Sequence, residues 1–145
     1  MPSIEDDRNC FVCGPDNPAG LHLNFQESED EIYTRLRFAA HFQGWKGVTH
    51  GGLVSTLLDE IMAKAVQARG MYGVTAEMCV RFRRPVPTEI EVEVSGRVME
   101  VRKRLVFTEG EIKDLDGSIL ASAKATFFIK EVKSEKSKVK DTNTA

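Results

Sequence analysis

One stretch of the chain has the apolar period of an α-helix, and the segments around it alternate like β-strands. Between about Gly51 and Arg69 the apolar residues form two adjacent columns that repeat every four positions, namely Leu53, Val54, Leu57, Leu58, Ile61, Met62, Ala65 and Val66. This spacing predicts a helix with a broad apolar face. A lone helix of this kind needs a sheet to cover that face. We therefore expect an α+β fold in which an antiparallel sheet wraps around one long central helix.

Alternation of apolar and polar residues with period two predicts the strands of that sheet. The expected strands cover residues 21–26, 32–38, 75–84, 89–101, 104–112 and 118–130. A short irregular turn at residues 41–47 leads into the helix. Asp116-Gly117 predicts a hairpin before the last strand, and Gly96 a bulge or bend within its own strand.

Composition bounds the function before any motif is considered. The 145 residues are most simply one domain at 10–130, with a flexible N-terminus at 1–9 and a disordered, Lys- and Ser-rich tail at 131–145. The formal charge of −2 gives no electrostatic reason to expect nucleic acid or an anionic membrane as a partner. No export signal or membrane-spanning run is present, so we expect a cytoplasmic protein.

The start of the predicted helix combines features that hydrolysis of an acyl compound requires. Gly51 and Gly52 leave the first backbone N–H groups of the helix unshielded, and these groups have no partner within the helix. Asp59 follows Gly52 by seven residues, which returns it to nearly the same face about 10 Å further along. The amides would hold a developing oxyanion, and the carboxylate would activate water or attack the carbonyl carbon.

A second motif lies near the N-terminus, where Cys10 and Cys13 form a Cys-x-x-Cys pair. Such a pair is half of a zinc site, a redox pair, or two small residues in a tight turn. The third cysteine, Cys79, belongs to a strand pattern, and the three histidines lie at no recognised ligand spacing. We favour the structural interpretation and keep metal binding as the alternative.

Several of these residues together resemble a known family. His50-Gly51-Gly52 followed by Asp59, the strand end from Phe82 to Pro85, and the order of helix and strands are similar to the hotdog-fold acyl-CoA thioesterases, in particular their phenylacetate-pathway (PaaI-like) branch. The Cys-Phe-Val-Cys-Gly opening followed by Asn-Pro-x-Gly-Leu is similar to a subgroup of that branch. The resemblance covers about residues 10–130.

The resemblance implies a homodimer, or a tetramer built as a dimer of dimers, that hydrolyses acyl- or aroyl-CoA with no metal and no organic cofactor. It places the thioester carbonyl at the helix N-terminus between two subunits. On this view Gly51 supplies the oxyanion donor with Gly52 beside it. Asp59 reaches in from the other subunit, as general base or as nucleophile.

The same resemblance suggests roles for further residues. Gln43 lies one residue before the position where relatives place an Asn or Gln, Thr75 matches a hydroxyl that helps to place water, and His50 shapes the helix entry through hydrogen bonds. Trp45 and Phe42 either line an acyl pocket or plug the end of the core. Arg81 and Arg83 belong to a basic group that either meets the phosphates of coenzyme A or is plain solvated surface.

Two neighbouring acids receive smaller roles. Glu60 is turned about 100° from Asp59 and is expected to be structural, while Glu77 is a weak second candidate. The alternatives to a thioesterase are a non-catalytic acyl-CoA-binding hotdog protein, a dehydratase or hydratase that would use a catalytic histidine, and a zinc or redox module built on the cysteine pair.

Overall fold

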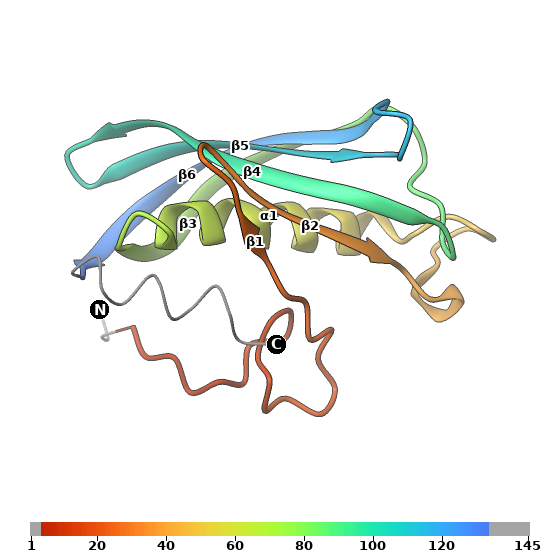
Figure 1. Cartoon of the computed structure of the whole chain (residues 1–145), viewed down its shortest axis with the longest axis horizontal. Coiled ribbons are helices and arrows are strands. Elements are labelled where there is room, and N and C mark those ends of the chain that lie inside the picture. Colours follow the sequence, from red (N-terminus) through yellow and green to blue (C-terminus); the bar gives the residue numbers. More distant parts are fainter. Residues whose placement is uncertain (1–3, 134–145) are drawn as a thin grey trace.

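The computed structural model describes residues 4–133, and in this range one long helix lies against a sheet of six strands (Figure 1). The elements in chain order are β1 (Gln26–Glu27), β2 (Ile32–Arg37), the 3₁₀ turn η1 (Ala40–Phe42), α1 (Gly51–Gln67), β3 (Met71–Phe82), β4 (Glu91–Arg102), β5 (Leu105–Lys113) and β6 (Ile119–Val132). The predicted helix and the hairpin at Asp116-Gly117 are confirmed.

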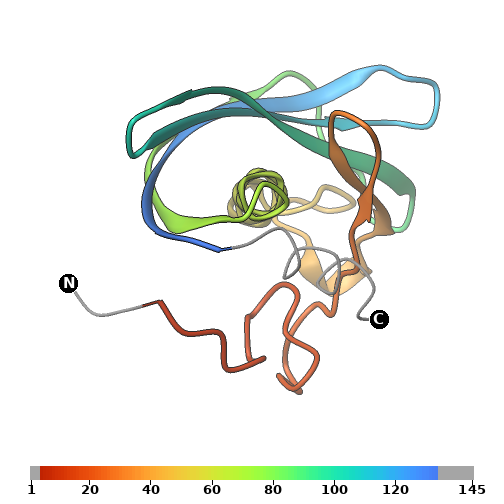
Figure 2. The ribbon, with the colours of Figure 1, turned by 60° about the vertical axis from the view of Figure 1, so that its left-hand side comes forward.

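The sheet is antiparallel throughout, in the order β1-β2-β4-β5-β6-β3. Seen along the axis of α1, it curls around the helix (Figure 2). The strand that follows the helix, β3, lies at one edge of the sheet and is hydrogen-bonded there to β6. The predicted α+β arrangement of a sheet wrapped around one central helix is therefore confirmed.

The apolar face of α1 forms the centre of the core. Leu58, Ile61 and Met62 have no exposed surface, and they meet buried residues of the central strands, such as Val92 and Ile112. Burial of side chains of this size contributes roughly 1.5–3 kcal/mol each before the entropy of ordering is subtracted. The apolar residues that predict the helix are therefore the ones that form the centre of the core.

Two paired glycines allow the helix to approach the sheet closely. Gly96 on β4 is the register partner of Gly110 on β5, and a Cβ atom on Gly96 would lie 2.9 Å from the carbonyl oxygen of Ile61. The expectation of a bulge at Gly96 is wrong, because the irregularity of β4 falls between Val98 and Glu100. Gly96 is required here for close packing of the strand against the helix.

The first expected strand, at residues 21–26, is also wrong over most of its length. Only Gln26 belongs to a strand, β1, whereas the amides of Leu21 and Leu23 donate to the carbonyls of Phe11 and Val12 at 2.9 and 3.0 Å. The alternating residues therefore pair with the cysteine loop and not with the sheet.

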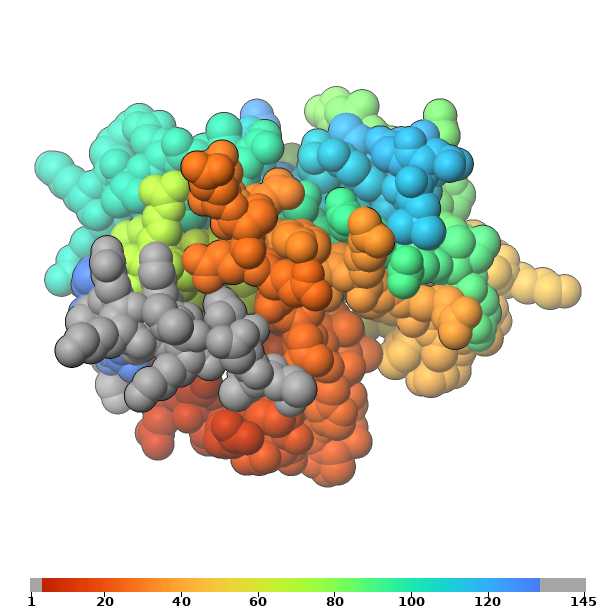
Figure 3. Space-filling model, in the orientation of Figure 1, coloured from red at the N-terminus to blue at the C-terminus, as the bar shows by residue number. Residues whose placement is uncertain are grey.

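The N-terminal segment lies on the side of the helix that faces away from most of the sheet (Figures 1 and 2), and its atoms form the lower part of the face shown in Figure 3. Val12 is buried and belongs to the core, and Arg8 forms an ion pair with Asp16. At the other end β6 continues to Val132, two residues beyond the predicted domain end. The rest of the predicted tail, 134–145, and residues 1–3 of the predicted flexible N-terminus lie outside the described residues. Within residues 4–133 no helix combines the length and apolar character needed to cross a membrane.

Candidate active site

The N-terminus of α1 is capped by the side chain that precedes it. The ring of His50 accepts a hydrogen bond at Nδ1 from the amide of Gly52, with an N···N distance of 2.9 Å. This is a hydrogen bond of the kind that the sequence suggests for His50 at the helix entry. The sequence also predicts an unshielded amide at Gly52, and this part is wrong because the His50 ring occupies that amide. Within residues 4–133, the Gly51 amide donates no hydrogen bond.

The free amide of Gly51 opens onto a groove of about 770 Å³. The groove lies between the helix entrance and the end of β3, and its lining includes Trp45, His50, Gly51, Phe82, Arg83 and Arg84. Trp45 is 84% exposed and Phe82 54%. Two exposed aromatic rings and two guanidinium groups beside a free amide suit a ligand with an apolar part and an anionic part.

Asp59 lies two turns further along α1, where it meets β3. The hydroxyl of Thr75 donates a hydrogen bond to Oδ1 of Asp59, with an O···O distance of 2.6 Å. Within residues 4–133, the second oxygen, Oδ2, accepts no hydrogen bond. One oxygen is thus fixed while the other is free to accept a proton or to attack.

A bulge in β3 brings Thr75 to this position. Strict alternation predicts that Thr75 and Met78 lie on opposite faces of the strand. The register shifts between Thr75 and Glu77, so that Thr75 is opposite Phe127 and Met78 is opposite Ala125, both of them buried residues of β6. An extra residue in one strand reverses the faces beyond it. Thr75 and Met78 therefore lie on the same face of β3, and the hydroxyl of Thr75 points to the helix.

Gly51 and Asp59 do not form one site within a single chain. Eight helical steps separate them by about 12 Å along the axis. Asp59 lies beside Thr75, whereas a Cβ atom on Gly51 would lie 3.7 Å from the ring of Phe82, at the other end of the same strand. Both groups lie next to β3, the edge strand.

The remaining candidate residues are divided between the groove and other places. Phe42 packs edge-to-face against Phe38, with ring centroids 6.2 Å apart, so it closes the end of the core. Oε1 of Gln43 accepts a hydrogen bond from the amide of Gly47 at 3.1 Å, which stabilises the loop. Arg83 lines both the groove and a neighbouring depression, whereas Arg81 lines only the depression.

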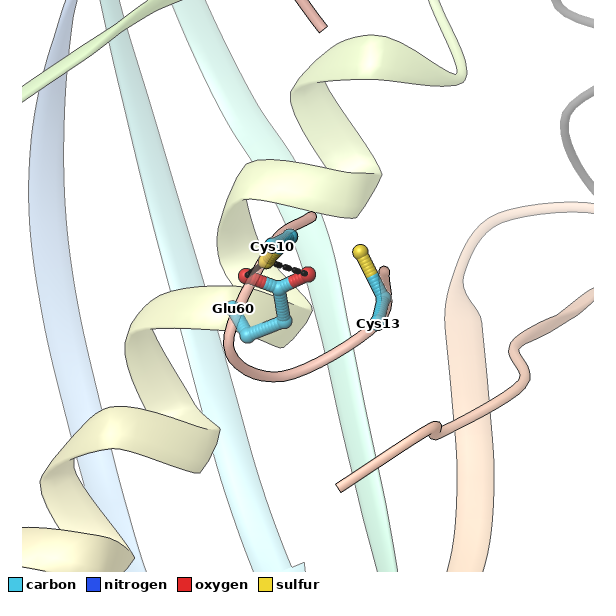
Figure 4. A group of neighbouring side chains, drawn as sticks. All are labelled: Cys10, Cys13 and Glu60. Atoms are coloured by element: carbon cyan, nitrogen blue, oxygen red, sulfur yellow. Dashed lines mark hydrogen bonds between the residues drawn. The ribbon is translucent and has the colours of Figure 1, made fainter. Parts of the chain in front are cut away.

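Glu60 faces the N-terminal loop rather than β3. Its carboxylate oxygens lie 3.9 and 4.0 Å from Sγ of Cys10, and Figure 4 shows it extending from α1 toward the loop that carries both cysteines. Burial, together with the charge of Glu60, raises the pKa of the Cys13 thiol to about 12. A redox-active Cys-x-x-Cys pair has a lowered thiol pKa, so this shift argues against the redox hypothesis.

A long helix enclosed by a curled antiparallel sheet defines the hotdog fold. The family model described as "Thioesterase superfamily" matches residues 46–121, more than half of the chain. The chain therefore belongs to the thioesterase superfamily. The matched range contains the helix entrance, Asp59 and Thr75.

Among curated proteins, acyl-coenzyme A thioesterase THEM4 of Xenopus laevis is 31% identical over 108 residues, which cover 73% of this chain and 48% of that protein. The chain spans about half the length of the THEM4 relatives it matches. Among solved structures, a thioesterase superfamily protein has a TM-score of 0.79 with 29% identity, over 83% of this chain and 60% of the other.

Two more distant structures share the fold. A hypothetical thioesterase of Streptococcus pneumoniae, solved with coenzyme A, has a TM-score of 0.72 with 18% identity, over 77% of this chain and 90% of the other. The E. coli PaaI protein has a TM-score of 0.72 with 17% identity, over 78% of this chain and 83% of the other. The resemblance drawn from the helix-entry motif is confirmed.

Proposed function

We propose that this chain hydrolyses acyl-coenzyme A thioesters in a homodimer whose sites lie between subunits. The observation that carries the proposal is the hydrogen bond from Thr75 to Asp59 at an edge strand, which holds one carboxylate oxygen and leaves the other free. The names of the THEM4 relatives and the coenzyme A in one structural neighbour support the substrate class.

Pairing of β3 with its copy would complete the site. Asp59 lies beside Thr75 and Gly51 beside Phe82. An antiparallel pair with its two-fold axis near Met78 would set Thr75 of one chain opposite the end of the partner's strand. Asp59 would then approach the free amide of the partner subunit's Gly51, which lies about 12 Å away within its own chain. A further association of dimers into a tetramer, and a cytoplasmic location, stay predictions from the sequence.

In the complete site each group has a separate task. The thioester carbonyl oxygen accepts a hydrogen bond from the Gly51 amide, which stabilises the negative charge that develops on it. Oδ2 of Asp59 takes the proton of an attacking water, or attacks the carbonyl carbon itself, while Thr75 fixes the carboxylate through Oδ1. Arg83 and Arg84, which line the groove, suit the phosphates of coenzyme A.

A non-catalytic acyl-CoA-binding protein is the second candidate, and the same hydrogen bond favours it, because a structural carboxylate is also held by a hydroxyl. A thiol-release assay with short-chain, long-chain and aromatic CoA esters separates the two. We expect the wild-type protein to release coenzyme A from at least one class, and Asp59→Asn to bind that ester without releasing thiol. Binding without thiol release by the wild type across the whole panel would favour the second candidate.

A further inference from the structure

The loop that carries Cys10 and Cys13 meets helix α1 at Glu60, which is turned about 100° from Asp59 around the helix axis. Sγ of each cysteine and a carboxylate oxygen of Glu60 all lie within 4.8 Å of one another, and all three residues are half-buried (Figure 4). Fifty residues separate Cys10 from Glu60 in the chain, so the fold assembles this group.

We propose that Cys10, Cys13 and Glu60 bind one Zn²⁺ ion that joins the N-terminal loop to the central helix. This site is independent of the proposed hydrolysis, which uses Asp59 on another side of α1.

The spacing of the Cys10 sulfur and the Glu60 oxygens is close to that around a tetrahedral ion. Zinc holds thiolate sulfur at about 2.3 Å and carboxylate oxygen at about 2.0 Å, so neighbouring ligand atoms lie roughly 3.5–3.8 Å apart. The distances from Sγ of Cys10 to the Glu60 oxygens, 3.9 and 4.0 Å, exceed this range by only a few tenths of an ångström. Three protein ligands leave the fourth position to water, which half-buried ligands allow.

The loop is shaped to present its sulfur atoms. The amide of Val12 points to Sγ of Cys10 at 3.4 Å, and such a donor stabilises negative charge on the sulfur. The amide of Gly14 closes the turn on the carbonyl of Cys10 at 2.9 Å. Any Cβ atom at Gly14 would lie 2.2 Å from the amide nitrogen of Cys10, so only glycine fits there. These contacts orient the ligands in the way that outer hydrogen bonds orient them in metal sites.

The ligand chemistry selects zinc. Thiolates are soft ligands that favour zinc over magnesium or calcium, and a carboxylate completes a mixed set. Binding replaces the two thiol protons by one divalent cation: both sulfur–hydrogen bonds break, two zinc–sulfur bonds form, and two protons pass to solvent. No oxidant or reductant takes part.

The first test is the metal content of the full chain. Reduced wild-type protein is incubated with Zn²⁺, desalted and analysed by elemental mass spectrometry. We expect stoichiometric zinc in the wild type, background levels in Cys10→Ser and Cys13→Ser, and an unchanged content in the matched control Cys79→Ser, because Cys79 lies on β3 outside the group. For Glu60→Gln we expect an affinity at least tenfold weaker in competition with a chromogenic chelator.

A second measurement uses only wild-type protein, so it stands even if a variant fails to fold. Zinc-loaded protein is titrated with a thiol reagent before and after addition of a chelator. We expect two further thiols per chain to react once the zinc is removed, and Co²⁺ to give a thiolate charge-transfer band in the same protein. The proposal would be overturned if reduced wild-type protein retained no zinc. It would also be overturned if the thiols reacted fully with the reagent while zinc was present. A zinc affinity of Glu60→Gln equal to that of the wild type would remove Glu60 from the site.

Discussion

Asp59 and Glu60 are adjacent acids on one helix, yet their surroundings differ in kind. Asp59 faces the edge strand β3, where one hydroxyl holds a single oxygen and the other oxygen is free. Glu60 faces a loop from the far end of the sequence, where both oxygens lie near a sulfur atom. The turn of about 100° per residue separates them onto different neighbours. The β3 side of α1 thus has the features of a reaction site. The loop side has the features of a structural contact that attaches the N-terminal loop to the helix.

The sharpest test of this contrast exchanges each acid for its amide. We expect Asp59→Asn to lower kcat for CoA-ester hydrolysis roughly 10²–10⁴-fold, because an amide neither accepts the proton nor attacks. Glu91→Gln, at an exposed position of β4, serves as the matched control and should retain turnover. Thiol release and size-exclusion chromatography measure activity and assembly. An equal loss of kcat in folded Glu60→Gln would contradict the division between the two sides.

The second prediction concerns the amide at the start of the same helix. Gly51 is the first residue of α1, a position where proline fits and lacks only the N–H group. His50 has φ −55° and ψ 132°, an extended conformation that proline tolerates before it. We expect Gly51→Pro to lower kcat roughly 10²–10³-fold by removing the oxyanion donor.

Gly51→Ala is the matched control, since it keeps the N–H group and its Cβ atom would meet Phe82 at an ordinary 3.7 Å. If Gly51→Pro, shown to be folded by circular dichroism, kept the kcat of Gly51→Ala, the amide would have no part in the reaction.

The contact between Thr75 and Asp59 gives a smaller expected effect. Thr75→Val keeps the shape of the side chain and removes the donor, so the carboxylate loses its fixed orientation. A hydrogen bond to a charged group contributes about 1.5 kcal/mol at the lower end, which corresponds to roughly a tenfold loss of kcat. Thr75→Ser should recover most of the activity. A loss that serine does not reverse would indicate packing rather than hydrogen bonding.

The sequence predicts the residues of α1 better than it predicts the strand and loop residues that contact them. The four-residue period locates α1 and its core face. Once the helix is located, Gly51 and Gly52 fall at its entrance and Asp59 falls two turns further along. The placement of Thr75 depends on a bulge, and nothing in the alternation of β3 indicates where the extra residue falls. The pattern at residues 21–26 is that of a strand, but its amides pair with the cysteine loop.

The contact of Glu60 with Cys10 could not be predicted from spacing either. It joins residues 50 positions apart, and only the packing of the N-terminal segment against α1 brings them together (Figure 4). The occupied amide of Gly52 was also missed. The signal for it is present in the sequence, because a histidine directly before a helix can cap its first turn through a ring nitrogen.

The last prediction tests whether the β3 side is completed by a second chain. Asp59→Asn and Gly51→Pro remove different halves of the proposed site, so each homodimer has two damaged sites. A mixed dimer has one site with both lesions and one that is intact. Random exchange makes half of the dimers mixed, so we expect an equimolar mixture, unfolded and refolded together, to regain about one quarter of wild-type activity. Refolding each variant alone is the control. A refolded mixture as inactive as its components would place both groups in one chain or outside the reaction, and the contrast between the two sides of α1 would lose its catalytic meaning.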